Sequence, residues 1–217
     1  MQVLFDIDGT LIDSRTSEGD TYADAVREVL GLEGLSTDWT RYAVVTDAGI
    51  LDQLAREGLG RPVTDDELAA VRALHVEGLR RCAERGEFRP LPGAREALAA
   101  ASERWPTAIA TGNFSPAARL KLDAAGIPWE GPLSGADDAS PRETILQRVM
   151  VPGLPTVSVG DGVWDVLAAR RLGVGFVGIA PTERHAERLR AAGAEHLVPD
   201  YRDLSGVLAL FQRVARG

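Results

Sequence analysis

The sequence predicts an α/β protein with a doubly wound parallel sheet and a smaller all-α domain inserted after the first strand. Two features of the chain support this prediction. From Thr107 onwards, short apolar runs alternate with amphipathic helical segments, as expected for β-α units on a mostly parallel sheet covered on both faces. Between Ser14 and Pro106, in contrast, the hydrophobic spacing is helical and no convincing strand occurs.

A buried strand opens the chain, in the sequence MQVLFDIDGT. Apolar, β-branched and aromatic residues predict this strand. Because side chains alternate along a strand, Asp6 and Asp8 are expected to share one site at the strand end, where open α/β sheets bind ligands. Two carboxylates there suit Mg²⁺, an Asp can attack a phosphoryl group, and Gly9 lets the backbone approach an anion. A simple strand-ending turn is the alternative interpretation.

Residues 14–91 are predicted to form the inserted helical domain, and residues 1–13 and 92–217 the α/β domain. Asp13 and Ser14 are expected to be turn or capping residues where the chain leaves the first strand. The helices expected before the alternating part of the chain are Asp20–Gly31, Trp39–Val44, Gly49–Glu57, Asp65–Arg85 and Gly93–Arg104.

The alternating part is expected to contain five further strands and five helices. The strands are Thr107–Ala110, Leu133–Gly135, Pro155–Val159, Val174–Ile179 and Glu195–Val198. The helices are Ser115–Ala125, Arg142–Val149, Asp165–Leu172, Thr182–Ala192 and Leu204–Ala215. A G-x-G-x-x-G pattern at 173–178 flanks and interrupts a strand instead of following one and opening a helix, so it does not indicate a dinucleotide site.

Polar residues follow two of these strands. Thr111-Gly112-Asn113 lies between a strand and a helix, where a hydroxyl and N–H groups at a helix start can bind an anion or where an ordinary turn can lie. Asp161 follows a later strand, and Asp165 comes one helical turn after it. Asp161 can complete a metal site, and Asp165 can reach back towards it or its partners. A turn residue and a helix cap are the alternative interpretation of these two acids.

Composition and charge exclude several classes of protein. The net charge of −8 argues against nucleic-acid and anionic-membrane partners, which require a basic surface. The single cysteine, Cys82, cannot form an internal disulfide and is expected to pack inside a helix. No cleavable apolar segment opens the chain, and no run reaches the roughly 18 apolar residues of a membrane span. A cytoplasmic enzyme is therefore expected.

Taken in order, DIDGT, TGN and GDGVWD resemble three motifs of the haloacid dehalogenase-like (HAD) superfamily of phosphohydrolases. The resemblance implies that Asp6 is the nucleophile and forms an aspartyl-phosphate. It implies that Asp8 acts as general acid and then as general base. It also implies an Mg²⁺ ion held by Asp6, by Asp161 and by the backbone carbonyl of Asp8. Asp165 would orient the groups around the metal or Arg142.

The second motif and the glycine of the first would hold the phosphate. The resemblance implies that Thr111 hydrogen-bonds the transferring phosphoryl group, helped by the backbone at Gly112 and Asn113 and by the backbone at Gly9.

The sequence departs from the HAD pattern at the third motif, where the family usually has a Lys before the helix preceding the fourth motif. The loop Asp137–Glu143 contains no Lys. Arg142, at the predicted helix start, is the expected replacement, although a guanidinium and an ammonium are not equivalent. Lys121, the only lysine, is the competing candidate. It lies about two turns into the preceding helix, roughly 9 Å from its start, and is otherwise expected to be a solvated helix charge.

These features predict a Mg²⁺-dependent phosphatase that hydrolyses a small phosphorylated metabolite. The acid at Asp8 favours phosphate over halide chemistry, because the haloacid dehalogenases lack an acid at that place. The helical block stands where many HAD members carry a cap that closes over the site. Thr46, Asp47 and His75 are candidates for its pocket, although each can equally be a capping, turn or packing residue.

Two alternatives remain open from the sequence: a phosphomutase with the same motifs, and a catalytically decayed member that only binds. The sequence does not choose between a monomer and a homodimer.

Overall fold

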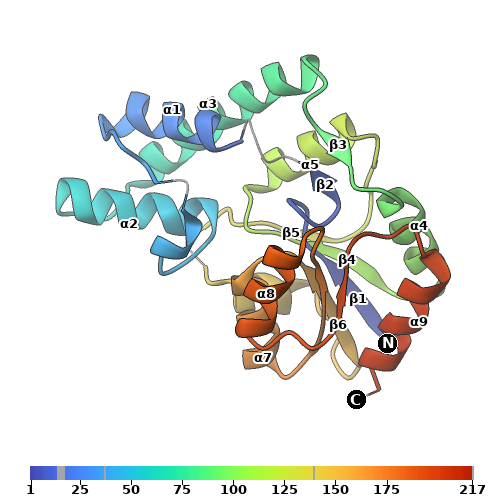
Figure 1. Ribbon diagram of the computed structural model, residues 1–217. Coiled ribbons are helices and arrows are strands. Elements are labelled where there is room, and N and C mark those ends of the chain that lie inside the picture. The colour runs from blue at the N-terminus through green and yellow to red at the C-terminus, as the bar shows by residue number, and fades with distance from the viewer. Residues whose placement is uncertain (14–17, 37, 139, 217) are drawn as a thin grey trace.

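The computed structural model describes residues 1–13, 18–36, 38–138 and 140–216 (Figure 1). These residues form a six-stranded sheet in the order β5-β4-β1-β6-β7-β8, with every neighbouring pair parallel. The predicted fold class is confirmed. The strands of this sheet are β1 Gln2–Phe5, β4 Thr107–Ala110, β5 Leu133–Ser134, β6 Thr156–Gly160, β7 Gly175–Ile179 and β8 Leu197–Val198.

Strand β1 lies at the centre of the sheet, between β4 and β6, because its apolar residues pack on both faces. Val3 and Phe5 belong to one hydrophobic cluster, whereas Leu4 belongs to a second cluster on the other face. Val3 lies opposite Thr107 of β4 and Val157 of β6. This register brings the residues that follow β1, β4 and β6 to the same edge of the sheet, next to the point where the strand order reverses.

Helices cover both faces of the sheet. Helices α4, α5 and α9 contribute to the larger hydrophobic cluster, which contains Val3 and Phe5. Helices α6 and α7 contribute to the cluster around Leu4, and α8 packs beside α7. The bounds of these helices are α4 Ala94–Arg104, α5 Ser115–Ala124, α6 Arg142–Val149, α7 Val163–Leu172, α8 Glu183–Ala191 and α9 Leu204–Val214.

The segment between β1 and α4 is mainly helical and lies to one side of the sheet (Figure 1). Helix α1 packs on α3, and α3 also packs on α5. The predicted helix Trp39–Val44 is wrong, because only Trp39–Arg41 is helical, as the single 3₁₀ turn η1, and Tyr42 is already extended. Such short 3₁₀ pieces are common connectors. The remaining helices are α1 Glu18–Leu30, α2 Asp47–Leu59 and α3 Asp65–Glu84.

Two short strands lie where the sequence predicts none. Strand β2 (Ile12–Asp13) pairs antiparallel with β3 (Arg89–Pro90). The expectation that no strand occurs in this part of the chain is therefore wrong at β3, because a two-residue ladder is too short to leave an alternating pattern. Asp13, expected in a turn, is part of β2, and Ser14 lies outside the described residues. The pair lies next to the predicted limits of the helical domain, which remain a prediction.

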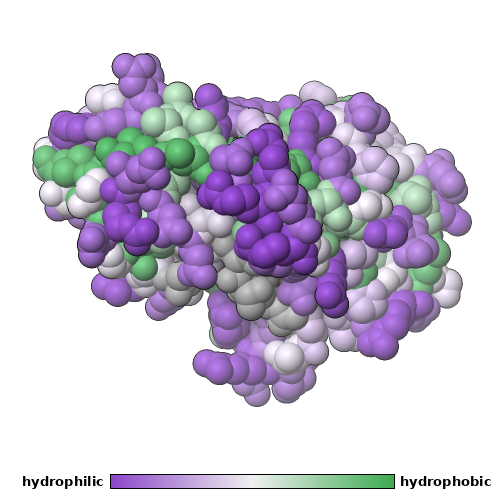
Figure 2. Space-filling model, turned by 90° about the horizontal axis from the view of Figure 1, so that it is seen from above, coloured by the Kyte–Doolittle hydropathy of each residue, from purple (hydrophilic) through white to green (hydrophobic). Residues whose placement is uncertain are grey.

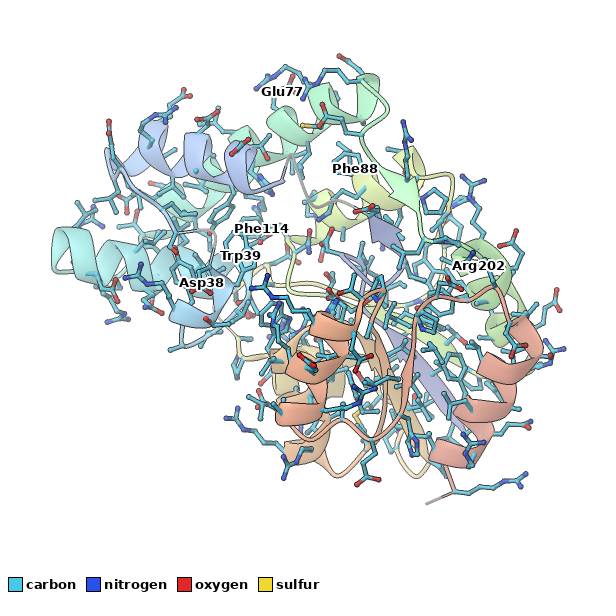
Figure 3. All side chains as sticks on the ribbon, viewed as in Figure 1. Asp38, Trp39, Glu77, Phe88, Phe114 and Arg202 are labelled. Carbon is cyan, nitrogen blue, oxygen red and sulfur yellow. The ribbon has the colours of Figure 1, made fainter. Side chains whose placement is uncertain are left out.

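Apolar side chains are largely used in packing. Phe88 and Phe114 are buried, whereas Glu77 and Arg202 lie on the outside of the molecule (Figure 3). Cys82 is buried, as expected for a packed thiol. Figure 2 shows a mostly hydrophilic face, with smaller apolar areas towards the end formed by helices α1 to α3. Within the described ranges, no helix is long and apolar enough to cross a membrane.

Candidate active site

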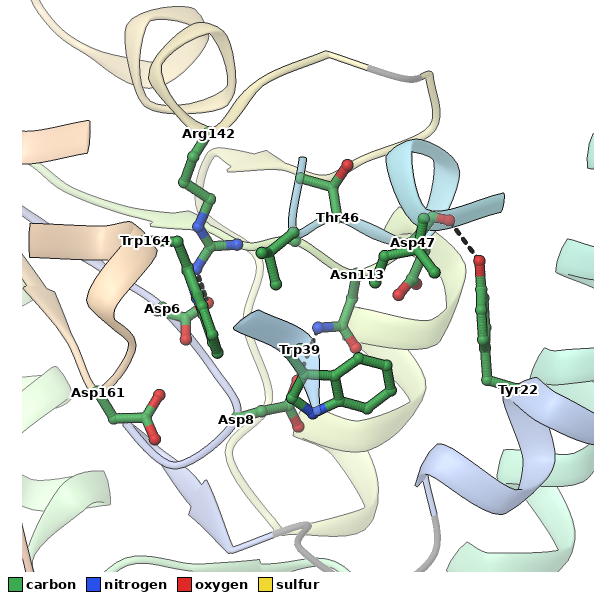
Figure 4. Close-up of a pocket in the computed structure, with 13 residues that line it drawn as sticks. Asp6, Asp8, Tyr22, Trp39, Thr46, Asp47, Asn113, Arg142, Asp161 and Trp164 are labelled. Atoms are coloured by element: carbon green, nitrogen blue, oxygen red, sulfur yellow. Dashed lines mark hydrogen bonds and ion pairs between the residues drawn. The ribbon is translucent and has the colours of Figure 1, made fainter. Parts of the chain in front are cut away.

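Acidic side chains from separate parts of the chain meet at the carboxyl edge of the sheet. Asp6 follows β1, Asp161 follows β6, and Asp165 lies in the first turn of α7. A carboxylate oxygen from each of these three residues lies within 4.8 Å of the other two. Asp8 lines the same pocket as Asp6 and Asp161 (Figure 4). The fold therefore gathers the acids of the first and fourth motifs into one site.

Burial and mutual repulsion together raise the pKa values of two of these carboxylates, and the neighbouring cation offsets only part of the effect. Burial raises the pKa of Asp6 to about 7, with Arg142 lowering it and Asp165 and Asp8 raising it. Burial also raises the pKa of Asp161 well above its usual value, and the charges of Asp6, Asp165 and Asp8 add to this effect. A cation among these oxygens would favour the ionised carboxylates. The all-oxygen donor set is the one that hard divalent ions prefer.

Arg142, at the start of α6, connects two of the acids. Its Nη2 donates to Asp6 Oδ1 at 2.7 Å and to Asp165 Oδ1 at 2.6 Å, and its Nε donates to Asp165 Oδ1 at 2.8 Å. The other oxygen of Asp165 accepts the Gly162 N–H at 3.0 Å. Burial opposes the charge of Arg142, but the carboxylates of Asp165 and Asp6 outweigh it and raise its pKa. Asp165 thus orients a guanidinium that stays cationic.

Lys121 reaches the site from α5. Its side chain is fully buried, and its Nζ lies 2.7 Å from Asp8 Oδ2. The interpretation of Lys121 as a solvated helix charge is therefore wrong. The long, flexible lysine stem spans the distance from the helix to the strand end. Both candidates for the third-motif cation contact acids of the first motif, since Arg142 contacts Asp6 and Lys121 contacts Asp8.

Asn113 and Thr111 form a further set of contacts around Asp8. Asn113 Nδ2 donates to Asp8 Oδ2 at 2.6 Å and to Thr111 Oγ1 at 3.0 Å. The backbone N–H of Asn113 also donates to Thr111 Oγ1, at 3.3 Å. Both side chains are buried. The turn that follows β4 is therefore directed at the acids and not at solvent.

Glycine is required at two positions of the site. Gly9 has a φ of +68°, and a Cβ there would lie 2.0 Å from Asp161 Oδ2. At Gly112, a Cβ would lie 2.7 Å from Arg142 Nη1 and 3.0 Å from the carbonyl oxygen of Val45. A larger residue would displace the acid or the guanidinium. The backbone at both positions thus forms part of the wall around the acids.

The start of α2 contacts the turn after β4. The Asp47 N–H donates to the Gly112 carbonyl at 2.7 Å, and Asp47 Oδ2 accepts the Phe114 N–H at 2.7 Å. Burial raises the pKa of Asp47 to about 7. Thr46 caps α2 by accepting the Gly49 N–H at 3.1 Å. The helical segment is therefore hydrogen-bonded directly to the motif that is expected to hold phosphate.

The three pocket candidates from the helical segment have different positions. Thr46 and Asp47 line the pocket, whereas His75 is absent from its described lining. The His75 side chain is buried, with Nδ1 3.1 Å from Thr21 Oγ1 and its ring edge-on to Tyr22. Burial lowers the pKa of His75 to about 3. His75 is thus a neutral packing residue of the helical segment.

The pocket offers a free volume of about 110 Å³, which is smaller than the roughly 300–1,000 Å³ typical of drug-sized ligand sites. Several of its lining residues were not candidates from the sequence, because aromatic and branched residues in helical segments usually predict a core. These are Tyr22, Trp39, Val45, Ile50 and Trp164. His185, in α8, was also missed; its Nε2 lies 2.7 Å from the Asp161 carbonyl oxygen. No motif surrounds His185 that could have indicated this contact.

Comparison with known proteins gives consistent matches. A family model described as haloacid dehalogenase-like hydrolase matches residues 2–173. "Probable phosphatase IndB" of Dickeya dadantii (strain 3937) is 27% identical, over 94% of this chain and 91% of that protein. The crystal structure of a hydrolase from Pseudomonas syringae is 25% identical, with a TM-score of 0.71, covering 96% of this chain and 98% of the other.

A second solved structure shows the same fold at lower identity. It is described as "Putative beta-phosphoglucomutase from Bacteroides vulgatus", is 22% identical with a TM-score of 0.73, and covers 100% of this chain and 90% of the other.

Proposed function

Since this chain belongs to the haloacid dehalogenase-like hydrolase family, we propose that it is a Mg²⁺-dependent phosphatase acting on a small phosphomonoester. The observation that carries the proposal is that Asp6, Asp8 and Asp161 line one pocket. Arg142 forms an ion pair with Asp6, and Lys121 forms one with Asp8. Phosphoryl transfer requires a nucleophile, a group that carries the proton, and cationic groups that bind the anionic phosphoryl oxygens.

The acids fit a divalent ion. The carboxylates of Asp6 and Asp161 approach one another closely, and burial and mutual repulsion raise the pKa of both. Mg²⁺ would be held by Asp6, by Asp161 and by the backbone carbonyl of Asp8. When bound, it offsets the charge of the phosphoryl oxygens. Both oxygens of Asp165 already accept hydrogen bonds, from Arg142 and from a backbone N–H. Asp165 is therefore assigned to orientation and not to direct ligation.

The first half-reaction transfers the phosphoryl group to Asp6. A carboxylate oxygen of Asp6 forms a bond to phosphorus while the bond from phosphorus to the ester oxygen breaks. Asp8 donates its proton to the departing alkoxide, so that a neutral alcohol leaves. In the second half-reaction, ionised Asp8 takes a proton from water, and the water oxygen attacks phosphorus. The bond from phosphorus to Asp6 breaks, which releases inorganic phosphate and regenerates the carboxylate.

The remaining residues hold the phosphoryl oxygens. Arg142 is fixed by Asp165 beside Asp6, and its free donor capacity suits anionic oxygens. The Thr111 hydroxyl and the backbone around Gly112 complete this wall. We assign the third-motif role to Arg142, because it contacts Asp6, the proposed nucleophile. A cation at that position supports a working site over a decayed one.

The helical segment, residues 14–91, is proposed to act as a cap. Its contact with the α/β part at Asp47, through Gly112 and Phe114, lies beside the acids. A cap docked there would exclude water during phosphoryl transfer, and its release would let the product leave.

The test is release of inorganic phosphate from a panel of small phosphomonoesters, with Mg²⁺ and with a chelator. Wild-type protein is expected to turn over with Mg²⁺ only, and Asp6→Asn is expected to lose at least 10³-fold in kcat, because an amide is a poor nucleophile. Asp24→Asn, which alters an exposed acid in α1, is the matched control. Isomerisation of a sugar phosphate without phosphate release would indicate a phosphomutase. No turnover on the whole panel would contradict the proposal.

A further inference from the structure

We infer that the alcohol released from the substrate carries a planar aromatic ring, which lies between Trp39 and Trp164. This inference rests on the phosphatase function proposed above and specifies its substrate class. Both indoles line the pocket that contains Asp6 and Asp8. Both also line an adjoining hollow, together with Asp8 and Asp161. The two rings therefore lie beside the acid that would protonate the departing alcohol, where the leaving group of the ester must be.

The two tryptophans come from different parts of the fold. Trp39 begins η1 in the helical segment, and Trp164 lies in the first turn of α7, three residues after Asp161. Figure 4 shows both indoles at the pocket, together with Asp6, Asp8 and Asp161. A substrate ring between them would contact the proposed cap and the α/β part at once. Ring binding and cap docking would then support each other.

The protein's own core covers these indoles only in part: Trp39 packs against the edge of the main hydrophobic cluster. Both side chains are partly exposed, and Trp164 belongs to none of the hydrophobic clusters formed by the described residues. Trp39 packs partly on Tyr42, with ring centroids 6.2 Å apart. A large aromatic surface left open inside a pocket, and not scattered over the exterior, indicates a binding site.

Three polar residues that the helical segment contributes to this wall already have partners within the protein, whereas the buried Oδ1 of Asn113, on the other side of the pocket, accepts no hydrogen bond from the described residues. The Tyr22 hydroxyl donates to the Asp47 carbonyl, the Thr46 hydroxyl caps α2, and one Asp47 oxygen accepts a backbone N–H. The other lining residues here, Val45 and Ile50, are apolar. A sugar would place hydroxyl groups against this part of the wall with few free hydrogen-bond partners, which is costly. An aromatic ring needs none, and two indoles offer it face and edge contacts.

The experiment compares three esters of primary alcohols: benzyl phosphate, ethyl phosphate and glucose 6-phosphate. Their leaving groups are chemically similar, so differences in kcat/KM report on binding of the group itself. Benzyl phosphate is expected to exceed each of the others by at least ten-fold. Ten-fold corresponds to about 1.4 kcal/mol, which aromatic contacts can supply.

Three variants locate the effect. Trp39→Leu and Trp164→Leu keep an apolar side chain but remove the ring, and each is expected to reduce the preference for benzyl over ethyl phosphate by five-fold or more. Trp129→Leu is the matched control. Trp129 lies outside the pocket lining, with its Nε1 donating to the Pro132 carbonyl, so the preference is expected to persist. Inhibition constants of benzylphosphonate and ethylphosphonate measure the same preference without turnover.

The outcomes separate this inference from the phosphatase proposal. Equal kcat/KM for the three esters, a preference for glucose 6-phosphate, or a benzyl preference untouched by both pocket variants would overturn the aromatic site while leaving the phosphatase intact. No hydrolysis of any ester would contradict the phosphatase. Binding of the two phosphonates, followed by tryptophan fluorescence, would then decide the aromatic site alone, with equal affinities counting against it.

Discussion

Replacing Lys121 with methionine tests whether the second cation of the site takes part in the reaction. Methionine keeps the length and flexibility of the side chain and removes only the ammonium group. Lys121 is fully buried, and its Nζ lies 2.7 Å from Asp8 Oδ2. The variant therefore removes the ammonium group from Asp8 Oδ2, the oxygen that also accepts the Asn113 amide at 2.6 Å.

The magnitude follows from this geometry. Two unit charges at this separation attract by about 6 kcal/mol at an effective dielectric constant of 20, before the cost of burying the lysine. The Asp8 side chain is 23% exposed, and Asn113 remains in contact with it, so water and the amide replace part of the interaction. We expect a net loss of about 2–3 kcal/mol in the transition state, or roughly 30- to 150-fold in kcat/KM.

The assay is phosphate release under saturating Mg²⁺, together with urea unfolding to measure stability. Stability is expected to fall by less than the roughly 3–5 kcal/mol typical of a broken buried ion pair, because Asp8 is partly exposed and can be hydrated and because methionine is well suited to a buried position. Arg119→Gln removes an exposed charge from the same helix and is expected to keep wild-type kcat/KM. If Lys121→Met retains activity within two-fold of wild type, the ion pair with Asp8 has no part in catalysis and the reasoning fails.

Three further predictions follow from the site. Arg142→Lys is expected to lower kcat by roughly 10- to 100-fold, because an ammonium cannot hold Asp165 through two nitrogens as the guanidinium does; unchanged kcat would exclude this role. Asp47 has a folded pKa of about 7, above its value in the unfolded chain, so its stabilising effect is present at acidic pH and is lost as pH rises from about 4 to 7. The amide of Asp47→Asn can still accept the Phe114 N–H but does not titrate. Between pH 5 and pH 8 the free energy of unfolding, measured with urea, should therefore change by roughly 1–3 kcal/mol less in the variant than in wild type. Asp161→Asn is expected to raise the Mg²⁺ concentration for half-maximal activity at least ten-fold, with calorimetric Mg²⁺ titration as the independent measure.

Most of the fold could be predicted from local patterns. The strand at the start of the chain and the β-α alternation after Thr107 are recorded in hydrophobic spacing. The two-stranded pair β2-β3 and the single turn η1 were mispredicted, because elements of two or three residues leave no period to detect. Their positions depend on contacts between segments far apart in the sequence.

For the site, position along a strand was more informative than position along a helix. A residue that follows a parallel strand must lie at the sheet edge, so Asp6, Thr111 and Asp161 could be placed together from sequence. Lys121 could not, because its contact with Asp8 depends on how α5 is rotated and packed. The same holds for Asp47, which contacts the site only because the helical segment docks there.

By itself, the sequence determined which strands end in functional residues, which acids follow those strands, and the family that the motifs resemble. These properties are local, since each depends on a few neighbouring residues and on the regular geometry of a strand. Only the tertiary structure decided which helix-borne groups complete the site: the Lys121 cation, the Asp47 contact and the two indoles at Trp39 and Trp164. Those depend on the packing of one element against another, and side-chain periodicity within a single segment carries no record of it.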